Sequence, residues 1–141
     1  GAFGGWSLYV KEGRLKFCYN LLGMRRYYTE SDSILPSGEH QVRMEFSYDG
    51  GGLARGGGVA LFLDGEKTGE GRVEITQPMT YSFDETLDIG YEGGTVVPAD
   101  ITAVESRFNG RILWVQIDLG SDDHNHLIKP EERLRVVMMR Q

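Results

Sequence analysis

The chain has 141 residues, of which 40% are hydrophobic and 26% are charged. This composition is typical of a folded globular domain, so disorder is not expected. A formal net charge of −6 argues against nucleic acid as a partner, because such a surface repels phosphate backbones. No apolar run approaches the roughly 20 residues that span a bilayer, so we expect no membrane partner. The single cysteine, Cys18, precludes an intrachain disulfide, and the sequence does not separate a cytoplasmic from a periplasmic or secreted location.

Strand-like sequence begins at Trp6, directly after a short glycine-rich start without an initiating Met or a signal peptide. We therefore expect residues 1–141 to form one domain that belongs to a longer protein. The function of the chain is then expected to depend on that longer protein.

Alternation of apolar and polar residues with a period of two dominates the first half of the chain. It predicts a hairpin of two strands on either side of the turn Lys11–Gly13. The apolar positions of that hairpin are Trp6, Leu8, Val10, Leu15, Phe17 and Tyr19. Glu39–Asp49 is the clearest strand, and we expect its even-numbered face, from His40 to Tyr48, to be buried.

Three further strands are indicated later in the chain. Val59–Leu63 runs into Asp64-Gly65, a strong signal for a tight hairpin, and the return strand carries Val73 and Ile75. Arg111–Gly120 is apolar at most positions, which predicts a strand in a sheet interior or against an extra covering layer. Short strands separated by Gly, Pro, Asp and Ser turns indicate an all-β antiparallel sandwich or barrel. One short C-terminal helix is expected after Pro130, although the same residues also fit a strand.

Several segments, taken in order, resemble the laminin-G/concanavalin A-like family. They are Gly38–Phe46, Val59–Gly65, Phe108–Ile112 with its continuation Val115–Ile117, and Pro130–Leu134. This resemblance implies an antiparallel two-sheet jelly-roll sandwich. A narrower resemblance, to the C-terminal domain of large bacterial arylsulfatases, is carried by Gly5–Val10, Phe17–Gly23, Gln41–Gly52 and Glu70–Pro78.

The arylsulfatase resemblance implies a non-catalytic accessory domain whose partner is the sulfatase catalytic domain of the parent chain. Sulfatases share a Cys/Ser-x-Pro-x-Arg motif whose nucleophile is oxidised to formylglycine. Here Cys18 is followed by Tyr-Asn-Leu-Leu, so the motif is absent and the chain is not expected to be an enzyme. A carbohydrate-binding module for neutral or sulfated glycans is the alternative function.

The best candidate ligand-binding group of the sequence consists of Arg25, Arg26, Tyr27 and Tyr28. Aromatic rings stack on sugars, and guanidinium groups donate charge-assisted hydrogen bonds to sulfate oxygens. Burial of these aromatic side chains in the core is the alternative, and we prefer it.

Asp84 and Asp88, within the acidic run 84–88, are the candidate metal ligands. Ca²⁺ takes several oxygen ligands, and carboxylates of loops supply them, but a solvated loop is the preferred interpretation and no cofactor is expected. His124 and His126 offer a second candidate metal pair, with a polar loop again preferred. The glycine-rich stretch 50–58 matches no phosphate-binding motif, and no pair of acids is spaced for glycoside hydrolysis.

Overall fold

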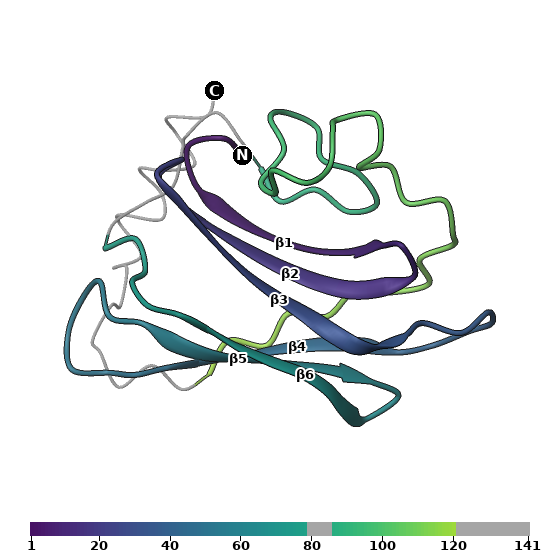
Figure 1. Cartoon of the computed structure of the whole chain (residues 1–141), viewed down its shortest axis with the longest axis horizontal. Coiled ribbons are helices and arrows are strands. Elements are labelled where there is room, and N and C mark those ends of the chain that lie inside the picture. Colours follow the sequence, from purple (N-terminus) through teal and green to yellow (C-terminus); the bar gives the residue numbers. More distant parts are fainter. Residues whose placement is uncertain (79–85, 121–141) are drawn as a thin grey trace, which may run out of the picture. The chain divides into compact units, whose positions relative to one another are not determined.

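The N-terminal hairpin of the sequence is the first part of a three-stranded antiparallel sheet. A computed structural model of the chain describes residues 1–78 and 86–120. It contains β1 (Gly5–Lys11), β2 (Arg14–Leu21), β3 (Arg25–Ile34), β4 (Val42–Tyr48), β5 (Gly57–Leu63) and β6 (Glu66–Val73). The strands form two sheets, β1-β2-β3 and β4-β5-β6, and every pairing is antiparallel (Figure 1). The predicted all-β class is confirmed for the described residues.

Both predicted hairpins are confirmed. In the first, Trp6 pairs with Tyr19 and Leu8 with Phe17. In the second, the turn between β5 and β6 places Asp64 at φ 51° and Gly65 at φ 87°. Positive φ at both central residues is the geometry of a type I′ turn, whose twist matches that of the flanking strands.

The hydrophobic core lies between the two sheets. Strand alternation directs every second side chain inward, and the buried cluster comprises Leu15, Phe17, Tyr19, Val59, Leu61 and Val73. Leu61, at the centre of β5, is fully buried. The two sheets are therefore packed together through side chains of β2, β5 and β6.

The sheets approach each other most closely where β3 meets β6. Gly69 of β6 lies so near β3 that a Cβ atom there would stand 2.6 Å from the carbonyl oxygen of Glu30. The absence of a side chain at this position permits the crossing. Neither β1 nor β4 is in close contact with a strand of the opposite sheet.

The chain divides into two compact units, Gly1–Arg111 and Ile112–Gln141. The expectation of a single domain over residues 1–141 stays a prediction. The strand predicted over Arg111–Gly120 is wrong: no described residue forms a ladder with this segment, and a strand requires such a ladder for its backbone groups. The predicted C-terminal helix after Pro130 lies outside the described residues.

The predicted burial of one face of β4 is only partly correct. Met44 is half-buried, but Val42, Phe46 and Tyr48 remain 37–41% exposed. Among the described residues β4 is an edge strand of its sheet, so its side chains have neighbouring side chains of the same sheet only on the side of β5. Within residues 1–78 and 86–120 the structure has no helix, and hence none with the length and apolarity of a membrane span.

Candidate functional site

Two hollows lie on opposite faces of the β4-β5-β6 sheet, within the first unit. The pleat of β4 separates them, because successive side chains of a strand point to opposite faces. Glu45 and Ser47 line the hollow on the outer face, whereas Met44 and Phe46 line the hollow between the sheets. We call the first the outer groove and the second the inner cleft.

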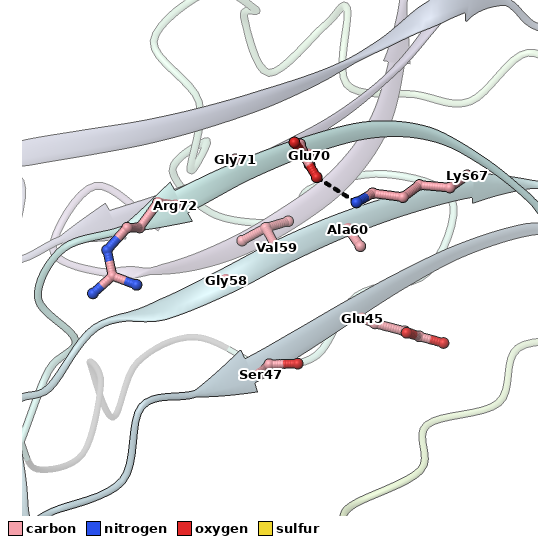
Figure 2. A pocket seen from close by; sticks show the side chains of 9 residues that line it. All are labelled: Glu45, Ser47, Gly58, Val59, Ala60, Lys67, Glu70, Gly71 and Arg72. Carbon is pink, nitrogen blue, oxygen red and sulfur yellow. Dashed lines mark hydrogen bonds and ion pairs between the residues drawn. The ribbon is translucent and has the colours of Figure 1, made fainter.

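The outer groove has a volume of about 430 Å³, and β5 forms its floor between β4 and β6 (Figure 2). Its lining residues are Glu45, Ser47, Gly58, Val59, Ala60, Lys67, Glu70, Gly71 and Arg72. The strand register places them in rows that cross the sheet. Gly58 lies between Ser47 and Arg72, and Ala60 lies between Glu45 and Glu70. Small residues on the middle strand thus leave a trough with charged and polar walls.

Each charged wall residue of the outer groove has a partner of opposite sign. The Arg72 guanidinium donates hydrogen bonds to Asp49, the shortest at 2.5 Å, and to Glu74 at 3.2 Å. Lys67 donates to Glu70, and this hydrogen bond holds the pKa of Glu70 below its usual value. The Glu45 carboxylate lies 3.1 Å from a guanidinium nitrogen of Arg43.

An aromatic ring continues the row of small residues on the outer face of β5. Phe62 follows Gly58 and Ala60 at the same spacing of two, and it pairs with Arg43 of β4. The Arg43 guanidinium lies over this ring, with its central carbon 4.1 Å from the ring centroid. The ring face is therefore already covered by a cation.

The inner cleft has a volume of about 320 Å³ and is mostly aromatic. Its lining residues are Trp6, Phe17, Tyr19, Met44, Phe46, Tyr48, Thr76 and Gln77. Phe17 and Tyr19 are buried, but Trp6 and Phe46 keep 40% and 38% of their surface exposed. The cleft therefore presents apolar surface in the part of the chain that the structure describes.

The backbone of β4 offers a second feature beside the inner cleft. The Gln41 carbonyl accepts a bond from Asp64, and the Asp49 amide donates to Gly56, so the odd-numbered residues bond to β5. In an antiparallel pair the even-numbered residues then direct their N–H and C=O groups away from β5. No strand pairs with that edge among residues 1–78 and 86–120. The open edge and the apolar side chains thus belong to the same residues of β4.

The predicted ligand-binding group does not share one face of the protein. Arg25, Arg26, Tyr27 and Tyr28 are consecutive on β3, so the pleat separates odd from even positions. The Arg26 side chain donates to the Val97 carbonyl at 2.7 Å, and the Tyr28 hydroxyl accepts from the Ala99 amide at 2.8 Å. These two residues hold the segment 97–100 against the outer face of the β1-β2-β3 sheet.

Tyr27 belongs to the aromatic group on the other face of the same sheet. Its ring packs at 6.5 Å from that of Tyr19, and Arg25 lies 5.9 Å from its centroid. Arg25 and Tyr27 therefore lie on one face of the sheet, whereas Arg26 and Tyr28 hold residues 97–100 on the other face.

Asp100 is the centre of a polar cluster that sequence reasoning missed. Its carboxylate accepts hydrogen bonds from the Tyr9 hydroxyl and from the Lys16 ammonium, both at 2.8 Å. Lys16 also lies 3.2 Å from Glu30. Asp100 is 84 residues from Lys16 and 91 from Tyr9, and no local pattern marks a contact of that separation.

Burial accounts for the chemistry of Cys18, which lies under this cluster. The side chain is fully buried, and burial raises the pKa of the thiol to about 12. A thiol with such a pKa stays protonated at neutral pH and is a poor nucleophile. These are the properties of a structural cysteine.

Of the predicted metal ligands, Asp88 is described and Asp84 lies outside the described residues. Asp88 accepts hydrogen bonds from the Gly93 amide at 2.6 Å and from the Thr86 hydroxyl at 3.1 Å, so it organises its own loop. No group of three or more His, Cys, Asp or Glu side chains suited to a metal ion occurs in the described parts of the chain. His124 and His126 also lie outside them.

Comparison of the chain with protein-family models, curated proteins and solved structures found no match. Function is therefore inferred from the outer groove, the inner cleft and the sequence itself.

A hydrogen-bonded pair of side chains just before β4, His40 and Asp64, gives a prediction for NMR. His40 Nδ1 lies 2.7 Å from Asp64 Oδ2, and this hydrogen bond raises the pKa of His40 above its ordinary value. We expect Asp64→Asn to lower that pKa toward about 6.5. A ¹H–¹⁵N titration of the three histidines, with His40→Gln to assign the signal, measures it. An unchanged pKa in Asp64→Asn would contradict the pairing.

Proposed function

We propose that the chain is a non-catalytic accessory domain of a sulfatase, with the concanavalin A-like jelly-roll fold, that packs against the catalytic domain of its parent. The observation that carries this proposal is the inner cleft, which is lined by the exposed Trp6 and by the exposed Phe46 and Tyr48 of β4. Among the described residues, no strand pairs with the outer edge of β4. The resemblance of four ordered segments to arylsulfatase C-terminal domains supports the identity of the partner. Two stacked antiparallel sheets support the fold.

The partner surface that fits this site is an extended strand with apolar side chains at alternate positions. Its backbone would pair with the groups that Met44, Phe46 and Tyr48 direct to the open edge of β4. Its apolar side chains would then enter the inner cleft beside the same three residues. Removal of apolar surface from water at about 25 cal/mol per Å² supplies the driving force.

The experiment measures association between the chain and an arylsulfatase catalytic domain that carries the formylglycine motif but lacks its own C-terminal region. We expect Phe46→Glu to weaken this association at least ~10-fold, because a charge in the inner cleft loses its hydration on docking. Glu45→Gln, one residue away on the opposite face, is the matched control and should leave the Kd unchanged. Titration calorimetry gives both values, and circular dichroism verifies that each variant is folded.

Three results would contradict the proposal. The first is the absence of association with the wild-type chain, and the second is an equal affinity of Phe46→Glu and the wild type. The third is hydrolysis of an aryl sulfate by the isolated chain that survives Cys18→Ala. Detection of a formylglycine motif upstream of Gly1 in the same reading frame would support the parentage.

Carbohydrate binding is the second candidate function, and a different observation favours it. The outer groove is open, and its walls carry the charged and polar side chains of Glu45, Ser47, Lys67, Glu70 and Arg72, which can form hydrogen bonds with sugar hydroxyls. Because the outer groove and the inner cleft lie on opposite faces of one sheet, the two functions do not compete for the same residues.

A further inference from the structure

We infer that the outer groove binds an uncharged oligosaccharide, with Gly58 and Ala60 as its floor. This inference rests on the second proposed function, carbohydrate binding, and names its ligand class and its residues. Three properties of the groove carry it: the empty space above Gly58, the hydrogen-bonding groups of both walls, and the pairing of every wall charge.

The floor of the groove is open because β5 carries glycine where strands prefer larger residues. A Cβ atom at Gly58 would meet nothing within 4 Å, so no packing contact requires glycine there. Glycine in a strand interior is destabilising and contributes no packing. By contrast, Gly69 on β6 is required by a close backbone approach. The space above Gly58 is therefore available to a ligand and has no structural use in the described residues.

The walls of the groove present both donors and acceptors to that space. β4 and β6 are separated by two strand spacings, about 10 Å, which leaves room for a flat ring between them. Glu45 and Glu70 offer carboxylate acceptors, while Ser47, Lys67 and Arg72 offer donors (Figure 2). A sugar hydroxyl is donor and acceptor at once, so it suits walls of mixed character.

The paired charges select against an anionic ligand. Lys67 already holds Glu70, and Arg72 already holds Asp49 and Glu74. A sulfate or carboxylate of the ligand would have to compete with these carboxylates, whereas a hydroxyl can add a hydrogen bond without breaking an ion pair. Stacking is also unavailable on Phe62, which Arg43 covers. The groove therefore recognises its ligand through hydrogen bonds.

The experiment titrates the full chain with neutral hexasaccharides of glucose, xylose and mannose, and with sulfated galactan and chondroitin hexasaccharides, by calorimetry and NMR. We expect at least one neutral hexasaccharide to bind, with a Kd that changes less than ~2-fold between 20 and 300 mM salt, because no net charge is neutralised. Gly58→Val should raise that Kd about 10-fold or more, since its side chain fills the floor. Its melting temperature should be no lower than that of the wild type. Phe46→Glu, on the opposite face, is the matched control and should bind the sugar as the wild type does.

Each other result overturns a defined part of the inference. Binding of sulfated sugars alone, lost in Gly58→Val, would overturn the ligand class but keep carbohydrate binding. Neutral binding that is unaffected by Gly58→Val would overturn the assignment to this groove. Failure of every sugar to bind the folded wild-type chain would overturn carbohydrate binding itself, and the inference with it.

Discussion

Gly69→Ala is expected to lower the free energy of unfolding by about 3 kcal/mol, the upper part of the range for overpacked sites. The added Cβ would stand 2.6 Å from the Glu30 carbonyl oxygen and 3.3 Å from the Ser31 Cα atom. Both neighbours are backbone atoms of β3, so a rotamer change cannot relieve the clash. The two sheets would have to move apart where β3 crosses β6. Urea unfolding followed by circular dichroism measures the change.

Gly58→Ala is the matched control, because it makes the same chemical change on the neighbouring strand. Its Cβ meets nothing within 4 Å, so we expect a neutral effect or a gain of about 0.5–1 kcal/mol, the usual advantage of alanine over glycine in a strand. If Gly69→Ala and Gly58→Ala changed the free energy of unfolding by the same amount, the close approach of β3 and β6 would not be the reason for glycine at position 69.

The sequence was sufficient to predict the elements that depend on local chemistry. Alternation over Trp6–Tyr19 and the Asp64-Gly65 turn specify hairpins whose partners are neighbours in the chain. A turn that requires positive φ fixes the register of the residues next to it, so the pairs Leu63–Glu66 and Phe62–Lys67 follow directly. The register then shifts by one residue between Phe62 and Leu61, and no local signal in the sequence marks this irregularity. The all-β class was predictable for the same reason.

The pattern of the chain was less informative where the outcome depends on a distant partner. β4 has the expected alternation, yet Phe46 and Tyr48 are less buried than predicted because β4 is the last strand of its sheet. Ile112–Leu119 has the composition of a buried strand, but no described residue pairs with it. Composition identifies a segment that can form a strand, whereas pairing decides whether it does.

The candidate sites were the least predictable part of the protein. The outer groove arises because Gly58 lies between Ser47 and Arg72 while Ala60 lies between Glu45 and Glu70, a register that links three strands. The sequence pointed instead to Arg25–Tyr28, since adjacent numbers suggest a common surface, but the pleat of β3 separates these residues. The sequence shows a glycine within the predicted strand at Gly58. Only the structure shows that a Cβ atom there would meet nothing within 4 Å, and this free space marks the groove.

Asp100→Asn is expected to lower the free energy of unfolding by about 2 kcal/mol at pH 7, as charged hydrogen bonds in a partly buried site commonly contribute. Lys16 would lose its closest carboxylate partner while keeping Glu30, and Tyr9 would lose a charged acceptor. Burial alone would raise the pKa of Asp100, but the hydrogen bonds from Lys16 and Tyr9 outweigh it and hold the pKa below its ordinary value. The ionised carboxylate is therefore the form that stabilises the fold.

The sign of the pH dependence follows from that lowered pKa. The contribution of Asp100 is complete above the ordinary carboxyl pKa of about 3.9 and is lost as the pH falls through the lower value of the folded state. The stability difference between wild type and Asp100→Asn should thus be largest near pH 7 and shrink toward pH 3. Tyr9→Phe, which removes one of the two hydrogen bonds, should cost about half as much. A difference that stays constant across this pH range would mean that Asp100 stabilises the fold through packing, and that its charge has no part in holding residues 97–100 on the β1-β2-β3 sheet.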